Sequence, residues 1–74
     1  MGRLIRLDRT GHTTLAEWTA ADTGTQDAAI AAFEGELERG MIGSATADDG
    51  RAEVVHALPL DADLVIMRRP IAGG

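Results

Sequence analysis

The apolar run near the end of the chain constrains the fold most. Leucine, valine, isoleucine and methionine occupy positions 64–67 without a polar interruption. Such a run is typical of a strand that is covered on at least one face and lies inside its sheet. Two arginines and a proline follow it, and the sequence closes with Gly73-Gly74. Glycine has no Cβ, so such a tail can thread a narrow channel or lie close to a partner's backbone.

The length of the chain limits what it can contain. Seventy-four residues make a single domain, here 1–74 with 69–74 as an extended tail. A chain of this size buries only about 60% of its unfolded surface. We therefore expect one sheet and one helix but no deep substrate cavity. The absence of cysteine excludes disulfides, thiolate chemistry and cysteine metal sites.

The charge of the chain bears on its partners and its location. A net charge of −5 argues against nucleic acid, whose phosphates require a basic surface. All seven basic residues are arginine, so the α-amino group is the one amine nucleophile. No apolar run approaches the roughly 20 residues of a membrane span, and Met1-Gly2-Arg3 does not begin a signal peptide. We expect a cytoplasmic protein that does not bind membranes.

Alternating patterns predict strands at 3–8, 13–18, 41–47 and 51–58, in addition to the final apolar one. Ile5 and Leu7 are expected to share one face of the first strand. In the second strand, Leu15 and Trp18 cannot both face inward without a bulge. We favour a covered face made by Thr14, Ala16 and Trp18. Asp48-Asp49-Gly50 is typical of a hairpin turn.

One amphipathic helix is predicted between the second and third strands. Thr25 is its expected N-cap, and Gly40 is the expected stop. The apolar stripe contains Ala29, Ile30, Phe33 and Leu37. The solvent-exposed side of the helix, called here the wet face, is expected to contain Glu34, Glu36 and Glu38.

The order strand, strand, helix, strand, strand, strand predicts an α+β fold. A single helix after a hairpin must cover one face of a small sheet, because no other element can bury its apolar stripe. The last strand is the most apolar and belongs in the middle. The helix provides the crossover that makes it parallel to the first strand. This arrangement, ββαβββ with a mixed sheet and one covering helix, is a β-grasp.

Both ends of the chain resemble ubiquitin. The opening contains Leu4-Ile5-Arg6-Leu7, Thr10-Gly11-His12-Thr13 and Ala21-Asp22-Thr23, and it resembles ubiquitin's first strand, Thr-Gly-Lys-Thr hairpin and Ser-Asp-Thr helix entry. The strand at 64–69 with its diglycine resembles the end of the same family. Asp61-Ala62-Asp63 and the segment 70–74 are more similar to the bacterial sulfur carriers, notably the small subunit of molybdopterin synthase. Residues 41–58 match neither pattern, and the missing lysines exclude lysine-linked chains.

The resemblance implies a function for the tail. An E1-like, ATP-dependent activating enzyme would adenylate the carboxylate of Gly74, so that Gly73 and Gly74 form the acyl-accepting C-terminus. The acyl group would then pass to an acceptor protein or, through a sulfur-transfer enzyme, become a thiocarboxylate. The face of the sheet without the helix is a candidate docking surface. The expected partner-binding residues are Leu4, Leu64, Ile66, Arg68, Arg69, Pro70, Ile71 and Ala72.

Three functions therefore stay open: a protein modifier, a sulfur carrier for cofactor biosynthesis, and a non-covalent binding module that uses the open face of the sheet. Catalysis by the chain itself is not expected, because the sequence contains no P-loop, dinucleotide fingerprint or nucleophile with a matching base. His12 and His56 are interpreted as solvated or packed residues rather than metal ligands. The residues after Asp48-Asp49-Gly50 lack the ligand spacing of a calcium loop. Neither a metal nor a cofactor is predicted.

Overall fold

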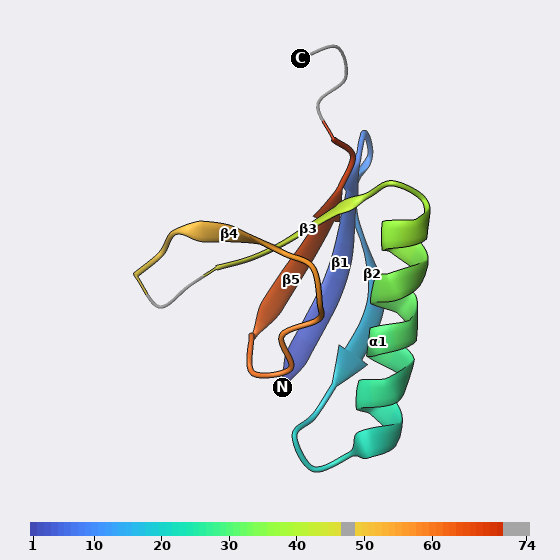
Figure 1. The fold of residues 1–74 in the computed structure, drawn as a ribbon, viewed down its shortest axis with the longest axis vertical. Coiled ribbons are helices and arrows are strands. Elements are labelled where there is room, and N and C mark those ends of the chain that lie inside the picture. Colours follow the sequence, from blue (N-terminus) through green and yellow to red (C-terminus); the bar gives the residue numbers. More distant parts are fainter. Residues whose placement is uncertain (47–48, 71–74) are drawn as a thin grey trace.

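A computed structural model describes residues 1–46 and 49–70, which form one helix and a mixed five-stranded sheet (Figure 1). The elements in chain order are β1 (Gly2–Asp8), β2 (Gly11–Trp18), α1 (Thr23–Glu38), β3 (Ile42–Thr46), β4 (Ala52–Val55) and β5 (Leu64–Arg68). The predicted α+β class and element order are confirmed. The fourth strand is shorter than predicted, because the chain bends at His56 and Ala57 to reach the turn at 60–61.

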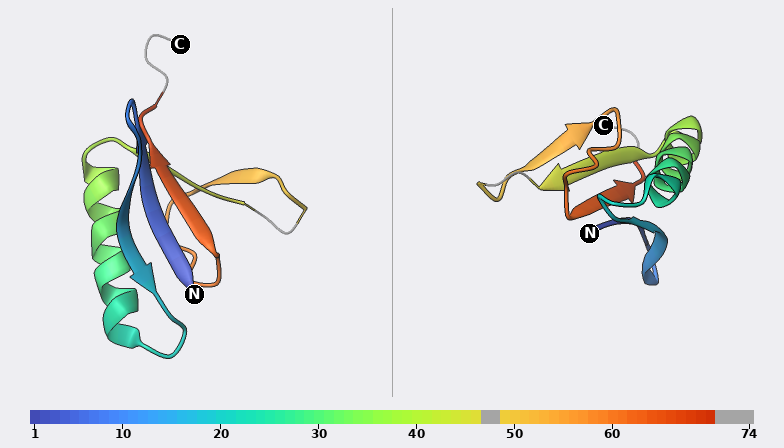
Figure 2. Two further views of the ribbon diagram at one scale, coloured as in Figure 1. Left: turned by 180° about the vertical axis from the view of Figure 1, so that it is seen from behind. Right: turned by 90° about the horizontal axis from the view of Figure 1, so that it is seen from below.

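The strands lie in the order β2-β1-β5-β3-β4. β5 is parallel to β1 and antiparallel to β3, so the most apolar strand is paired on both sides as predicted. β1 pairs antiparallel with β2, and β3 pairs antiparallel with β4. The two ends of the sheet are therefore β2 and β4. The hairpin of β3 and β4 extends away from the helix (Figures 1 and 2).

The core lies between the sheet and α1. It consists of Leu4, Trp18, Ala29, Phe33, Val65 and Met67. Gly43 of β3 lies directly under the ring of Phe33, and a Cβ at this position would be 2.7 Å from Phe33 Cε1. The Trp18 Nε1–H donates a hydrogen bond to the carbonyl of Leu60 (2.9 Å), which ties β2 to the loop before β5.

A bulge decides which face each residue of β2 occupies. Leu4 pairs with Ala16, but the next residue, Ile5, pairs with Thr14. Leu15 is therefore the extra residue, and it packs against the core together with Ala16. The prediction that Thr14 would face the core is wrong, because the bulge gives that role to Leu15. Ala16 and Trp18 face the core as predicted.

The helix begins earlier than predicted and stops where expected. Its N-cap is Asp22 rather than Thr25, because Asp22 Oδ1 accepts hydrogen bonds from the N–H groups of Gly24 (2.9 Å) and Thr25 (3.2 Å). Gly40 has a φ of 85°. The N–H of Gly40 donates to the carbonyl of Leu37, and the N–H of Met41 donates to that of Glu36. This pair of bonds is a Schellman motif.

Candidate interaction sites

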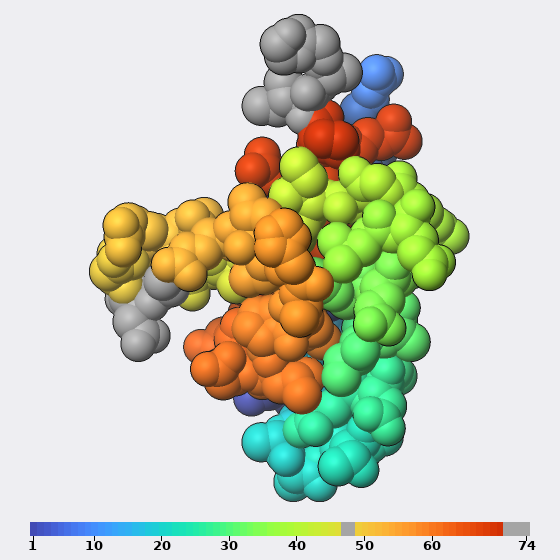
Figure 3. All heavy atoms as spheres, viewed as in Figure 1, coloured from blue at the N-terminus to red at the C-terminus, as the bar shows by residue number. Residues whose placement is uncertain are grey.

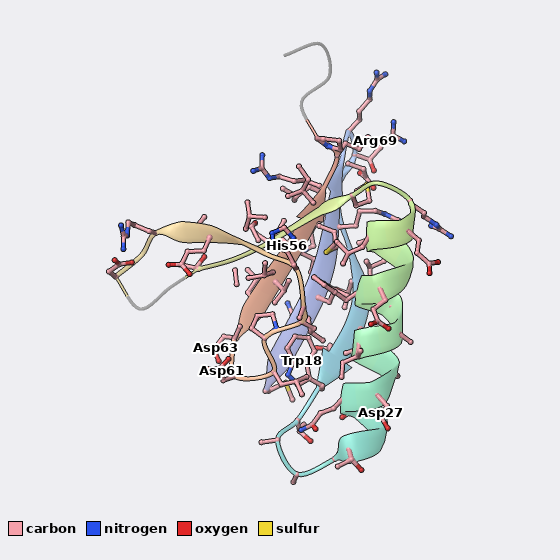
Figure 4. The ribbon with its side chains drawn as sticks, viewed as in Figure 1. Trp18, Asp27, His56, Asp61, Asp63 and Arg69 are labelled. Atoms are coloured by element: carbon pink, nitrogen blue, oxygen red, sulfur yellow. The ribbon has the colours of Figure 1, made fainter. Side chains whose placement is uncertain are left out.

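The end of β5 is the predicted starting point of the tail. β5 ends at Arg68, and Arg69 and Pro70 after it are exposed. The remaining predicted tail residues, Ile71, Ala72, Gly73 and Gly74, lie outside the described residues. Their roles as partner-binding residues and as the acyl-accepting end stay predictions. Arg69 lies at the opposite end of β5 from Asp61 and Asp63, which precede this strand (Figure 4).

The open face of the sheet, defined here as the side of the strands turned away from α1, contains Ile5, Leu64 and Ile66. Ile5 pairs with Ile66 in the parallel register, and the Leu64 residue is 37% exposed. Leu64 and Ile66 therefore lie where the sequence predicted. Ile5 is only 8% exposed, so it contributes little accessible surface to this face.

The prediction that Leu4 would join the open face is wrong. Leu4 pairs with Val65 and is 0% exposed, so it belongs to the core under α1. Ile5 takes the place on the open face that Leu4 was expected to occupy. Because Leu4 and Ile5 are both apolar, the alternation of the sequence did not decide which of them the helix would cover.

A charged cluster joins β1 to the end of α1. Arg6 Nη1 lies 3.2 Å from Glu36 Oε1 and 3.3 Å from Glu36 Oε2, and Arg39 Nη1 lies 3.5 Å from Glu36 Oε2. The Glu36 side chain is only 6% exposed. The assignment of Glu36 to the wet face is therefore wrong, whereas Glu34 and Glu38 are exposed as predicted. The helical period contained the signal, since Glu36 follows the core residue Phe33 by three positions.

Two shallow hollows lie beside this cluster, near the end of β5. Both are lined by Leu7, Asp8 and Arg69. One of them also contacts Arg9 and Thr10, and the other contacts Arg6, Glu36, Arg39, Gly40, Met41 and Pro70. We call this region the basic end. The sequence predicted a partner-binding role for Arg69 and Pro70 at this end. It did not predict that Arg6, Arg9 and Arg39, which other segments contribute, would lie beside them.

The Asp8 carboxylate accepts hydrogen bonds from within its own turn. Its Oδ1 accepts hydrogen bonds from Thr10 Oγ1 (2.7 Å) and from the Thr10 N–H (2.8 Å). These bonds favour the ionised form and lower the pKa of Asp8 from its ordinary value of 3.8, with the hydroxyl as the largest cause. Asp8 is therefore held by the turn rather than directed at a neighbouring arginine.

A third hollow lies at the other end of β5, between the β3–β4 hairpin and the loop at 59–63. Its described lining residues include Glu53, Asp61 and Asp63, and none of them is an arginine. In Figure 3 the hairpin stands out sideways from the body beside this loop. Among the described residues that line the three hollows, the arginines therefore all lie at the end of β5 that leads to Arg69.

Residues 1–46 and 49–70 contain no group of three or more potential metal ligands. His12 lies on β2, His56 follows β4, and both are exposed. Within the same described ranges, no helix has the length and apolar character needed to cross a membrane. Comparison with family models, curated proteins and solved structures found no match to this chain.

Proposed function

We propose that the fold is a ubiquitin-like β-grasp and that the chain is a protein modifier or carrier activated at Gly74. The strand order β2-β1-β5-β3-β4 supports the β-grasp, as does the parallel β1–β5 pair. One observation carries the functional proposal. The central strand β5 leads directly into the exposed residues Arg69 and Pro70, after which the sequence reads Ile-Ala-Gly-Gly.

The proposed chemistry takes place in the active site of a partner. A carboxylate oxygen of Gly74 attacks the α-phosphorus of ATP, which forms an acyl-adenylate and releases pyrophosphate. A thiol of the activating pathway displaces AMP to form a thioester, and an acceptor amine then displaces the thiol to form an amide. The chain supplies the acyl group, and contacts made by its folded body hold the tail in position.

A sulfur carrier is the second candidate. In this case a persulfide sulfur attacks the acyl-adenylate and displaces AMP, and cleavage of the sulfur–sulfur bond by a thiol leaves a thiocarboxylate on Gly74. The exposed position of Pro70, outside any strand, and the acidic turn before β5 favour this candidate. A binding module is the third candidate, and the exposure of Leu64 on the open face favours it.

Intact mass measurement of the protein before and after incubation with ATP, Mg²⁺ and a lysate of its source cells tests the proposal. The mass before incubation shows whether the mature chain ends at Gly74. Hydroxylamine added to one sample traps an acyl-adenylate or thioester as a hydroxamate. Covalent adducts to larger proteins support the modifier, and replacement of one terminal oxygen by sulfur supports the carrier.

In a variant extended by one alanine after Gly74, the carboxylate of Gly74 becomes part of a peptide bond and can no longer be adenylated. A variant extended by one alanine before Met1 is the matched control and should react normally. The modifier and carrier proposals are both wrong if no ATP-dependent mass change occurs or if the two extended variants react equally. Partner binding that survives removal of Gly73 and Gly74 without any mass change supports the binding module.

A further inference from the structure

The basic end carries a charge opposite to that of the rest of the chain. Among the described residues, four arginines and two carboxylates line its two hollows, and their side chains sum to a charge of +2. The whole chain carries −5, so the remainder carries −7. These arginines come from separate segments of the sequence: β1, the β1–β2 turn, the end of α1 and the residue after β5. Only the folded chain brings them together.

Of the three arginines outside this end, two have a carboxylate partner of their own, and Arg68, the last residue of β5, forms no ion pair within the described residues. Arg3 pairs with Glu17 at 3.4 Å and Arg51 pairs with Asp49 at 2.7 Å. At the basic end, Arg6 and Arg39 share the single carboxylate of Glu36. Within the part of the chain that the structure describes, neither Arg9 nor Arg69 forms an ion pair. The guanidinium groups at this end therefore retain hydrogen-bond donors for an external anion.

An exposed apolar residue lies among these arginines. Leu7 lines both hollows and is 44% exposed. A simple anion such as phosphate would use the arginines but would leave Leu7 in water. A ligand that has carboxylates on both sides of an apolar side chain would satisfy both features. Several separate carboxylates also suit arginines that come from four different segments.

We propose that the basic end is a docking surface for an acidic protein segment with an apolar residue between its carboxylates. The carboxylates pair with Arg9, Arg39 and Arg69, and the apolar side chain covers Leu7. A long polyanion such as nucleic acid fits less well, because it would be repelled by the −7 of the remaining chain. The proposal does not depend on chemistry at Gly74, and binding can be measured without ATP or an activating enzyme.

The probe is the peptide Glu-Glu-Leu-Glu-Glu with acetylated and amidated ends, titrated into the full chain labelled with ¹⁵N at low salt. We expect saturable shifts of the amide signals of Leu7, Arg9 and Gly40. Binding should weaken as salt is added, because exposed ion pairs are screened. The peptide Gln-Gln-Leu-Gln-Gln should not bind, and a peptide with alanine in place of leucine should bind more weakly.

Two double variants make the test specific. R9Q combined with R69Q should weaken binding by roughly three- to tenfold, which corresponds to two exposed ion pairs. R3Q combined with R51Q removes the same net charge from arginines elsewhere, and it should change binding by less than about twofold. Circular dichroism checks that both variants stay folded.

Four results would overturn the proposal. The first is the absence of saturable shifts at millimolar peptide, and the second is equal weakening by the two double variants. The third is tighter binding of a short duplex RNA than of the peptide to the same amides. The fourth is concentration-dependent self-association of the chain without peptide, which would mean that a second copy occupies the basic end.

Discussion

At the residue scale, the two glycines Gly43 and Gly35 occupy very different environments. Gly43 is pressed under Phe33, and an added Cβ would lie 2.7 Å from Cε1, 3.1 Å from Cζ and 3.3 Å from Met67 Sδ. Gly35, on α1, has open space where its Cβ would be. The identity of Gly43 is therefore required by packing, whereas that of Gly35 costs the helix stability without improving a contact.

Alanine at these two positions should change stability in opposite directions. Gly43→Ala overpacks the core and should lower the free energy of unfolding by about 1–3 kcal/mol. Gly35→Ala should raise it by about 0.5–1 kcal/mol, because alanine loses less backbone entropy in a helix. Urea unfolding followed by tryptophan fluorescence measures both. A neutral Gly43→Ala would show that the Phe33 ring can move aside without loss.

The Asp8 turn predicts a pH effect at a single residue. Thr10→Ala removes the hydroxyl that contributes most to the low pKa of Asp8, while the Thr10 N–H bond stays. The pKa of Asp8 should therefore rise toward 3.8 without reaching it. A folded-state pKa below the unfolded one stabilises the protein above the unfolded pKa, and this contribution is lost as the pH falls through the folded pKa.

Carbon-13 NMR titration of the Asp8 carboxyl measures this change directly. The stability difference between the parent and Thr10→Ala should be largest near neutral pH and should shrink as the solution is acidified. Thr14→Ala, an exposed change on β2 outside this turn, should leave the Asp8 titration where it was. An unchanged pKa in Thr10→Ala would assign the lowering to the remaining causes, which are the backbone N–H groups of Thr10 and Gly11 and the charge of Arg6.

At the scale of elements, one buried carboxylate, that of Glu36, links α1 to β1 through an ion pair. Glu36 is on the side of α1 that packs on the sheet, and Arg6 approaches both of its oxygens from β1. Arg6 is partly covered, with 32% of its side chain exposed, whereas 72% of the Arg39 side chain is exposed. Covered and exposed partners of the same carboxylate should therefore contribute unequally to stability.

Glutamine at each arginine separates the two contributions. Arg6→Gln leaves the buried Glu36 carboxylate with a single, exposed partner, and it should lower the free energy of unfolding by about 1–3 kcal/mol. Arg39→Gln should cost less than about 1 kcal/mol. Chemical denaturation of both variants and of the double variant gives the coupling between them. Equal costs for the two single changes would contradict the assignment of Arg6 as the main partner of Glu36.

At the scale of the whole molecule, the sheet order separates two regions of opposite charge. β5 runs through the middle of the sheet, with the carboxylates of Asp61 and Asp63 before its first residue and Arg69 after its last (Figure 4). The parallel pairing with β1 brings the β1–β2 turn to the same end as Arg69. The Schellman turn of α1 adds Arg39 there. The basic end is therefore a product of topology and not of any one segment.

The amino-acid sequence by itself determined the element order, the central place of the last strand and the stop of the helix at Gly40. Each of these depends on local patterns: an uninterrupted apolar run, a helical stripe and a glycine shortly after that stripe. The tertiary structure decided the face of Leu4, the bulge at Leu15 and the burial of Glu36 beside Arg6. The helical period places Glu36 near Phe33, but which residues the helix covers and which distant charges it brings together depend on packing between elements that are far apart in the sequence.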